Sequence, residues 1–258
     1  MSALAVVTGA SSGIGAVFAR KLAARGYRLL LVARRRDRLE ALAAEFPGRA
    51  EAWPADLTCD PDLQKLEQRI AGDESLELLV NNAGFGTLGR FFEIPVDSQD
   101  AMHRLHILAT MRLTHAALRG MVRRNRGGVI NVSSVAGFAQ SPGNVSYCST
   151  KAWINIFTST LDLDLRSAGS AVTVQALCPG FTYSDFHDTA GIDRNKIPKA
   201  LWLEADRVVE DSLRGLDRGK VFVIPTWRYK AIAAFVRNLP RPLLRFGAIR
   251  YARRTGRT

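Results

Sequence analysis

The stretch TGASSGIG, Thr8–Gly15, follows an apolar run at Leu4–Val7 and leads into a helical pattern. Its glycines at positions 9, 13 and 15 let a backbone turn tightly and approach a ligand closely. The free amide groups at the start of a helix favour the negative charge of a diphosphate. A glycine triplet alone is also compatible with an ordinary strand–helix turn. Because a strand precedes this loop and a helix follows it, we interpret it as a nucleotide-binding loop.

The same alternation of strand and helix continues along the chain. Strand-like runs are ALAVVTG, YRLLLVA, AEAWPADL, LELLVNNAG, GGVINVSS, AVTVQALCPG and KVFVIP. Helical patterns cover about 13–25, 35–46, 61–71, 98–124, 145–167 and 204–216. Strands that are apolar throughout are buried on both faces, and helical crossovers impose parallel order. The sequence therefore predicts an α/β fold, a Rossmann-like doubly wound sheet of seven mainly parallel strands with helices on both faces.

The basic charge of the chain is confined to one end. The formal net charge is +12, but the eleven Lys and Arg residues after position 217 have no Asp or Glu among them. The first 217 residues carry 25 basic and 24 acidic side chains and are close to neutral. A nucleic-acid-binding face over the whole surface is therefore not expected, and no nucleic acid is predicted as a partner. With no signal-peptide pattern and no apolar run long enough to cross a bilayer, we expect a cytoplasmic protein.

No metal site is expected from the sequence. The three cysteines, Cys59, Cys148 and Cys178, lack the spacing of zinc ligands and are too few and too scattered for a disulfide framework. The four histidines do not add a cluster of metal-ligand spacing.

Several motifs in order point to one family. They are TGASSGIG at 8–15, ADL at 55–57, NNAG at 81–84, NVSS at 131–134, YCSTK at 147–151 and CPG at 178–180. Over residues 3–224 this series resembles the short-chain dehydrogenase/reductase superfamily. The resemblance implies an oxidoreductase of class EC 1.1.1.- with a nicotinamide cofactor. It also implies a homodimer or homotetramer.

The resemblance assigns cofactor contacts residue by residue. Asp56 would hydrogen-bond the adenine amino group, or could be a residue at a helix N-terminus. The turn at 81–84 would flank the adenosine ribose, and Asn81 could instead stabilise that turn; in each case both roles could coexist. The predicted cofactor-binding residues are Gly9, Ser11, Ser12, Gly13, Ile14, Gly15, Arg34, Arg35, Asp56, Leu57, Asn82, Ala83, Gly84, Tyr147, Lys151, Pro179, Gly180, Thr182 and Ser184.

The end of the second strand favours NADP(H) over NAD(H). An NAD site usually has an acidic residue there to bind the ribose hydroxyls. This chain has Arg34 at about that place and Arg35 after it, and a guanidinium pairs well with a 2′-phosphate. Asp37 lies too far along to be the usual acid. The alternative interpretation is a helix that simply begins with basic residues.

Ser134, Tyr147 and Lys151 form the predicted catalytic group. Tyr147 and Lys151 are four residues apart and share one face of a helix. A neighbouring ammonium and an oxidised nicotinamide would both favour the phenolate, so Tyr147 can act as the general acid and base. Ser134, at the end of the fifth strand, would hold the substrate oxygen. A YxxxK pair alone would more often be a surface pair.

His106 stands where the family has a fourth catalytic residue. The resemblance places an asparagine 28 residues before Ser134, and this chain has His106 there. In relatives that asparagine holds a water against the active-site lysine as part of a proton relay. A neutral imidazole has one donor and one acceptor and could hold a water too. The alternative is a histidine that only packs in its helix, and His103, His115 and His187 match no motif.

Apolar residues near the expected site suggest the substrate class. Phe85, Phe138, Phe186 and Trp202 are candidates to line it, although they could equally be core. We expect a catalytic domain over 1–225, with a substrate lid over about 185–203, and a basic amphipathic tail over 226–258. The tail could contact an anionic membrane surface peripherally, pack on another subunit or be an ordinary terminal helix.

Two functions remain open at this point. The first is an oxidoreductase that transfers a hydride between NADP(H) and a hydrophobic ketone, aldehyde or long-chain 3-oxoacyl substrate, or the corresponding alcohol. The second is a non-catalytic sensor that binds NADP on the same fold. Intact Ser134, Tyr147 and Lys151 favour the enzyme.

Overall fold

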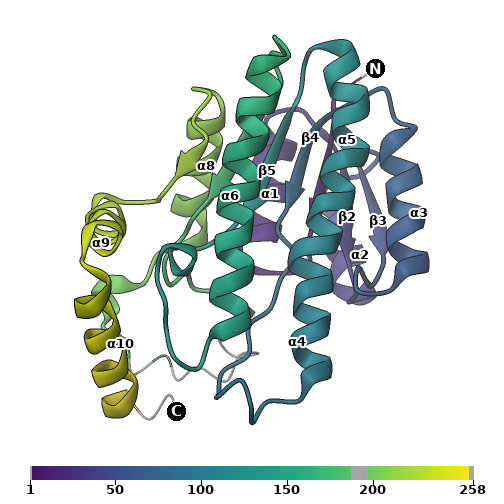
Figure 1. The fold of residues 1–258 in the computed structure, drawn as a ribbon. Coiled ribbons are helices and arrows are strands. Elements are labelled where there is room, and N and C mark those ends of the chain that lie inside the picture. The colour runs from purple at the N-terminus through teal and green to yellow at the C-terminus, as the bar shows by residue number, and fades with distance from the viewer. Residues whose placement is uncertain (1, 187–193, 195–196, 256–258) are drawn as a thin grey trace.

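The computed structural model describes residues 2–186, 194 and 197–255, and within them seven strands form one sheet (Figure 1). The order across the sheet is β3-β2-β1-β4-β5-β6-β7, and every neighbouring pair is parallel. The strands are β1 (Leu4–Thr8), β2 (Arg28–Ala33), β3 (Ala50–Pro54), β4 (Leu76–Asn81), β5 (Gly128–Val132), β6 (Thr173–Leu177) and β7 (Phe222–Val223). The predicted doubly wound sheet is confirmed.

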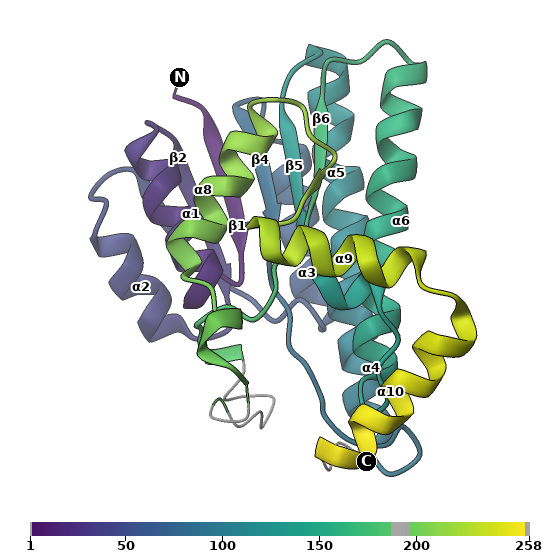
Figure 2. The ribbon, with the colours of Figure 1, turned by 90° about the vertical axis from the view of Figure 1, so that its left-hand side faces the viewer.

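Helices cover both faces of this sheet (Figures 1 and 2). They are α1 (Gly13–Ala24), α2 (Arg36–Ala44), α3 (Asp60–Ala71), α4 (Val96–His103), α5 (Thr110–Arg124), α6 (Val145–Ser167), α8 (Ala205–Leu216), α9 (Trp227–Asn238) and α10 (Arg241–Thr255). Short helical turns are η1 (Arg104–Ala109), η2 (Val135–Phe138) and η4 (Lys199–Leu201). The helix predicted to begin at Arg35 begins one residue later, and Arg35 is its N-cap.

The two faces of β1 show how the sheet is buried. Ala5 and Val7 point to one side, into a core shared with α1, α2 and α8. Leu4 and Val6 point to the other side, into a core shared with α3 and α5. All four side chains are buried, because successive residues of a strand face opposite sides and both sides are covered.

The order of the strands fixes where a ligand can bind. The chain moves outward from β1 through β2 to β3, and then crosses back to β4 on the opposite side of β1. The loops after β1 and β4 therefore diverge and leave a crevice at the carboxyl ends of these strands. The motif at Thr8–Gly15 follows β1, and the turn at 81–84 follows β4, so both border this crevice.

The helix predicted over about 98–124 is present, but its middle is not α-helical. Residues Arg104–Ala109 form a π-helix between α4 and α5. A π-helical turn accommodates an extra residue and rotates the side chains that follow it. His106 lies within this turn and is buried.

Buried amides tie the central strands to the helices on one face. Asn81 on β4 donates to Asn131 on β5 at 2.9 Å and to Thr114 on α5 at 3.0 Å. Asn131 in turn donates to the Thr158 hydroxyl on α6 at 3.0 Å. These groups have left water, so each hydrogen bond holds the strands and helices in one relative position.

Two helices complete the C-terminal part of the chain. In Figure 2, α9 crosses in front of the sheet and α10 continues beyond it. Among the described residues, no helix is both long and apolar enough to cross a membrane.

Replacing Thr158 by Val tests the buried amide series. The change keeps the shape of the side chain but leaves the Asn131 amide without its acceptor on α6, so we expect a loss of about 1–3 kcal/mol in the free energy of unfolding. Urea unfolding measures it. Ser159→Ala removes a hydroxyl that bonds only within the same helix, to Ile156 O at 3.0 Å, and is expected to change stability by less than about 0.5 kcal/mol. Equal losses in the two variants would contradict this interpretation.

Candidate active site

A cavity of about 490 Å³ opens at the carboxyl ends of the strands. Its wall joins the loop after β1, the end of β2, the turn after β4, the start of α6 and the loop after β6. Of the predicted catalytic and cofactor-binding residues, all but Gly15 and His106 lie in this wall. Gly15 and His106 lie behind it.

The loop after β1 needs glycine for its shape. Gly9 and Gly13 have φ of +65° and +53°, in the left-handed region that favours glycine. A Cβ at Gly15 would overlap the Gly9 carbonyl oxygen. The Asn82 side chain donates to the carbonyls of Thr8 and Gly9 at 2.9 and 3.2 Å, which fixes the loop to the turn after β4.

Asp56 is held by its own turn. Its Oδ1 accepts hydrogen bonds from the backbone amide and the hydroxyl of Thr58, at 3.0 and 2.8 Å. Its Oδ2 lies 3.9 Å from a guanidinium nitrogen of Arg34. The side chain thus stabilises a turn that precedes α3, while it remains in the cavity wall; an adenine contact stays a prediction.

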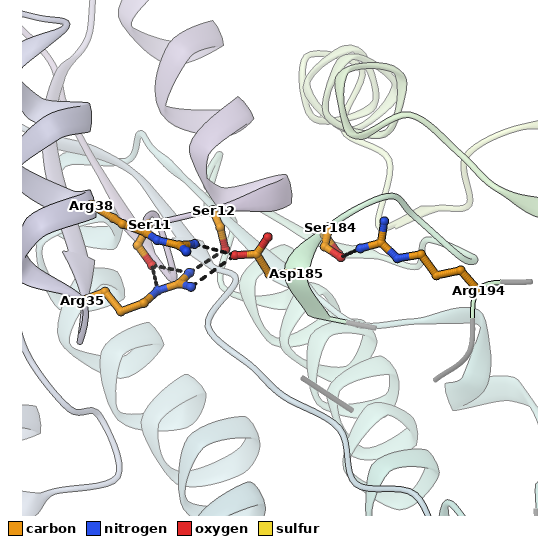
Figure 3. Close-up of polar contacts among 7 residues, drawn as sticks. All are labelled: Ser11, Ser12, Arg35, Arg38, Ser184, Asp185 and Arg194. Carbon is orange, nitrogen blue, oxygen red and sulfur yellow. Dashed lines mark hydrogen bonds and ion pairs between the residues drawn. The ribbon is translucent and has the colours of Figure 1, made fainter. Parts of the chain in front are cut away.

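An arginine cluster lies at the end of the cavity beside β2. Arg35 donates through Nε and Nη2 to the Ser11 hydroxyl, at 3.2 and 3.0 Å, and through Nη2 to the Ser12 hydroxyl at 2.8 Å. Arg35 and Arg38 both donate to a carboxylate oxygen of Asp185, at 3.2 and 2.7 Å (Figure 3). Partial burial acts to raise the pKa of Asp185, but the hydrogen bonds from the two arginines outweigh it and hold this pKa below its ordinary value.

The predicted catalytic residues meet at the opposite part of the same wall. Ser134 ends the segment after β5, and its hydroxyl accepts a hydrogen bond from the Ala136 amide at 3.1 Å. Tyr147 and Lys151 lie on the first turns of α6. The Lys151 ammonium donates to Val132 O at 2.8 Å and lies 5.7 Å from the centre of the Tyr147 ring.

Burial controls the protonation of these groups. It raises the pKa of Tyr147 to about 12, against an opposing effect of Ser134. It lowers the pKa of Lys151 to about 8. In the chain without cofactor, desolvation of the phenolate dominates the pKa of Tyr147. The expected joint effect of the ammonium and an oxidised nicotinamide stays a prediction. At neutral pH Tyr147 carries its proton.

His106 uses both ring nitrogens on protein partners. Its Nε2 accepts a hydrogen bond from the Phe85 amide at 3.2 Å, so Nδ1 carries the proton and donates to the Thr150 hydroxyl at 2.9 Å. The Thr150 hydroxyl donates to the backbone carbonyl oxygen of Tyr147 at 3.0 Å. A Cβ at Gly84 would lie 2.8 Å from Nε2, so glycine is what lets the imidazole approach this turn.

These bonds favour a positioning role for His106 over a water relay. A neutral imidazole offers one donor and one acceptor, and both are taken. His106 connects the turn after β4 to α6, beside Tyr147 and Lys151. His103 bonds within its own helix, to Gln99 O at 2.8 Å, and His115 is exposed on α5. His187 lies outside the described residues.

Sequence reasoning missed a contribution from α9. The Tyr229 hydroxyl donates to Leu201 O at 2.6 Å and accepts from the Phe181 amide at 3.1 Å. Its ring lies against Gly180, where any side chain would overlap it. Ile232, Ala233 and Val236 of α9 also line the cavity. The boundary at 225/226 stays a prediction, but the contacts of α9 cross it.

The predicted apolar lining is present in part. Phe85, Phe138 and Phe186 lie in the cavity wall, and the Phe186 and Tyr147 ring centres are 5.6 Å apart. Trp202 lies outside this wall and stacks on Tyr183, with ring centres 4.8 Å apart. The lid predicted over about 185–203 falls partly outside the described residues and stays a prediction.

Comparison with known proteins agrees with this arrangement. The family model described as short chain dehydrogenase matches residues 3–195. An uncharacterized oxidoreductase of Myxococcus xanthus is 32% identical over 243 residues, 93% of each chain. A short-chain dehydrogenase from Sphingobium yanoikuyae, solved in complex with NADPH, is 34% identical, has a TM-score of 0.82 and matches over 93% of this chain and 97% of its own.

A second solved structure is the bulky-bulky ketone specific alcohol dehydrogenase from Comamonas testosteroni. It is 31% identical, has a TM-score of 0.78 and matches over 93% of this chain and 95% of its own. The fold and the cavity define a dinucleotide-binding type of α/β oxidoreductase. The chain belongs to the short-chain dehydrogenase family.

Replacing His106 by Asn should change the response of stability to acid. Burial, and then the nearby Lys151 charge, lower the pKa of His106 well below 6.5, so the folded chain holds it neutral. The unfolded chain takes up a proton below about pH 6.5, and the folded chain therefore loses about 1.4 kcal/mol of stability per pH unit as the pH falls further.

Urea unfolding at about pH 7.5 and about pH 5.5 measures this loss. The His106→Asn variant should lack it, while His115→Asn, which changes an exposed residue, should keep it. The same acid dependence in the wild type and in His106→Asn would show that His106 is not the buried neutral group.

Proposed function

We propose that the protein is an NADP(H)-dependent oxidoreductase of class EC 1.1.1.-, acting on a hydrophobic carbonyl substrate or the corresponding alcohol. The observation that carries this proposal is one cavity whose wall contains both the glycine loop and the group Ser134, Tyr147 and Lys151. The first suits a dinucleotide diphosphate, and the second suits proton transfer to a carbonyl oxygen. We find no observation that favours the non-catalytic sensor.

The residues present fit a nicotinamide dinucleotide. The glycine loop lies in the cavity wall at the start of α1, where free backbone amides would favour the charge of a diphosphate. Arg34 and Arg35 at the end of β2 would take a 2′-phosphate, and the side chain of Arg34 is 70% exposed. The relative from Sphingobium yanoikuyae, solved with NADPH, supports this preference.

The chain's own groups suit reduction. Tyr147 keeps its proton at neutral pH, since burial raises its pKa to about 12, and can give that proton to a carbonyl oxygen held by Ser134. Lys151 would bind the nicotinamide ribose. When bound, the reduced cofactor supplies the hydride for the carbonyl carbon.

The cavity wall beside Tyr147 supports a hydrophobic substrate. Aromatic residues and the apolar side chains of α9 surround this part; they are Phe85, Phe138, Phe186, Ile232 and Val236. Such a wall gains affinity by removing apolar surface of the substrate from water. The similarity to a dehydrogenase specific for bulky ketones points the same way. We therefore place bulky ketones and long-chain 3-oxoacyl groups before small aldehydes.

Replacing Tyr147 by Phe should abolish turnover while cofactor binding remains. Loss of the proton donor is expected to lower kcat by about 10²–10⁴-fold, measured as NADPH oxidation with a panel of ketones and aldehydes. Tyr183→Phe is the matched control, because Tyr183 lies outside the cavity wall, and it should keep full activity. Undiminished turnover in Tyr147→Phe would contradict the mechanism. A wild type that binds NADPH and turns over no substrate would support the sensor.

We also propose that α9 and α10 contact an anionic membrane surface. Their exposed apolar residues, here called the C-terminal apolar surface, are Trp227, Ile232, Phe235, Leu243, Phe246 and Ile249. Exposed basic residues lie among them at Lys230, Arg237, Arg245 and Arg250, and the sequence from Arg218 onward has no acidic residue. Apolar anchors combined with positive charge are typical of helices that lie on anionic bilayers. Homo-oligomerisation and a cytoplasmic location stay predictions from the sequence.

Vesicle sedimentation tests the C-terminal apolar surface. At low salt the protein should sediment with vesicles that contain phosphatidylglycerol and remain in solution with vesicles of phosphatidylcholine alone. The double change Phe235→Ser and Phe246→Ser should weaken binding by at least about tenfold, because each side chain loses apolar burial. Phe92→Ser, at an 82% exposed residue far along the chain, should have no effect. If the double variant bound these vesicles as tightly as Phe92→Ser does, the proposal would be contradicted.

A further inference from the structure

Asp185 brings a carboxylate into the arginine cluster at the end of β2 (Figure 3). The residue follows the loop after β6, almost 150 residues along the chain from Arg35 and Arg38. Its oxygen lies 3.2 Å from Nη1 of Arg35 and 2.7 Å from Nη1 of Arg38. Asp185 and Arg35 both lie in the wall of the cavity.

The guanidinium of Arg35 is anchored on one edge and faces the carboxylate on the other. Its Nε and Nη2 bond to the hydroxyls of Ser11 and Ser12 on the glycine loop, and its Nη1 bonds to Asp185. The serines fix the plane of the guanidinium. The remaining nitrogen of the guanidinium, Nη1, is therefore paired with the Asp185 carboxylate of the same chain.

The backbone beside Asp185 is fixed too. Ser184 packs so closely on the glycine loop that a Cβ at Gly13 would lie 2.7 Å from the Ser184 Cβ. The Ser184 carbonyl accepts a hydrogen bond from Arg194 at 2.8 Å (Figure 3). The backbone next to Asp185 therefore contacts the glycine loop and holds the Asp185 carboxylate at the arginine cluster.

We propose that Asp185 competes with the cofactor's 2′-phosphate for Arg35 and thereby limits the preference for NADP(H). This inference rests on the proposed function, in which Arg34 and Arg35 take that phosphate. A carboxylate and a phosphate are both acceptor-only anions that seek the same edge of a guanidinium. Bringing the phosphate to Arg35 means either displacing the carboxylate or placing two anions side by side.

The competition distinguishes the two nicotinamide cofactors. NAD(H) carries no 2′-phosphate and has no group to compete with Asp185, so the carboxylate weakens the binding of NADP(H) selectively. The side chains of the Arg35–Asp185 pair are 42% and 47% exposed, so solvent screens the interaction and the effect is modest. Removing the charge should therefore strengthen NADPH binding by about three- to fivefold.

Binding measurements on Asp185→Asn test the proposal without any turnover. Dissociation constants for NADPH and NADH are measured by fluorescence titration, and that for adenosine 2′,5′-bisphosphate by calorimetry, at fixed low salt. We expect tighter NADPH and bisphosphate binding in Asp185→Asn, with NADH unchanged within about twofold. Asp217→Asn is the matched control, because Asp217 pairs bidentately with Arg25 on the surface away from the cavity, at 3.0 Å for each bond.

The outcomes separate this inference from the function on which it rests. A wild type that prefers NADPH, with an Asp185→Asn variant whose ratio of NADPH to NADH affinity is unchanged or lower, would overturn the inference and leave the proposed function standing. Parallel changes for both cofactors would also overturn it, since they would report only a loosened loop. A wild type that binds neither cofactor would overturn the proposed function and this inference with it. A wild type without preference for NADPH would overturn the proposed cofactor preference alone, and the inference would then stand only if Asp185→Asn gains that preference.

Discussion

The position of α6 against the end of β5 governs the site, because Tyr147 and Lys151 both lie on that helix. Ser133 donates to Lys151 O at 2.9 Å, Asn131 donates to Thr158, and His106 donates to Thr150. These ties are buried, and they join α6 to β5, to the residue directly after β5, and to η1. A buried polar pair is costly to break, so together they restrict the helix to one register against the sheet. The reactive groups are thus placed by hydrogen bonds of the Lys151 backbone and of other residues on the same helix.

The cavity has two ends of different chemistry. At the end beside β2, guanidinium groups, serine hydroxyls and a carboxylate lie partly in water. There the charged groups stay hydrated, and water strongly screens their interactions. At the end beside α6, Lys151 is buried and Tyr147 is partly buried, and desolvation shifts the pKa of each in the direction that favours its neutral form. The first end can therefore select a charged ligand, and the second can hold a proton ready for transfer.

Much of the fold and of the candidate site could be predicted from the sequence, because local sequence patterns determine the strands, the helices and the motifs on them. The apolar strands and the helical spacing give the parallel sheet, and the sheet brings the loop at Thr8–Gly15 and the end of β5 to the same edge. The placement of Ser134, Tyr147 and Lys151 in one wall follows from their register on those elements. Motif spacing also singled out His106. It could not show that the two ring nitrogens bond to Phe85 and Thr150.

The rest depends on contacts between distant segments. The π-helical turn at Arg104–Ala109 has no local signal, since its residues suit an ordinary helix. The pairing of Asp185 with Arg35 and Arg38 joins residues almost 150 positions apart, and the packing of Tyr229 on Gly180 joins a predicted tail to the site. Burial also decides the pKa of Tyr147, and the degree of burial is a property of the fold.

The central claim is that, in this cavity, bound NADPH would give a hydride to a carbonyl carbon while Tyr147 supplies the proton. Incubation of the protein with NADPH deuterated at both C4 positions and a bulky ketone, followed by mass spectrometry of the product, tests it most directly. We expect an alcohol with deuterium on the carbinol carbon and a hydroxyl proton from solvent. NADPH that binds in the cavity but delivers no deuterium to any ketone or aldehyde of the panel would contradict it.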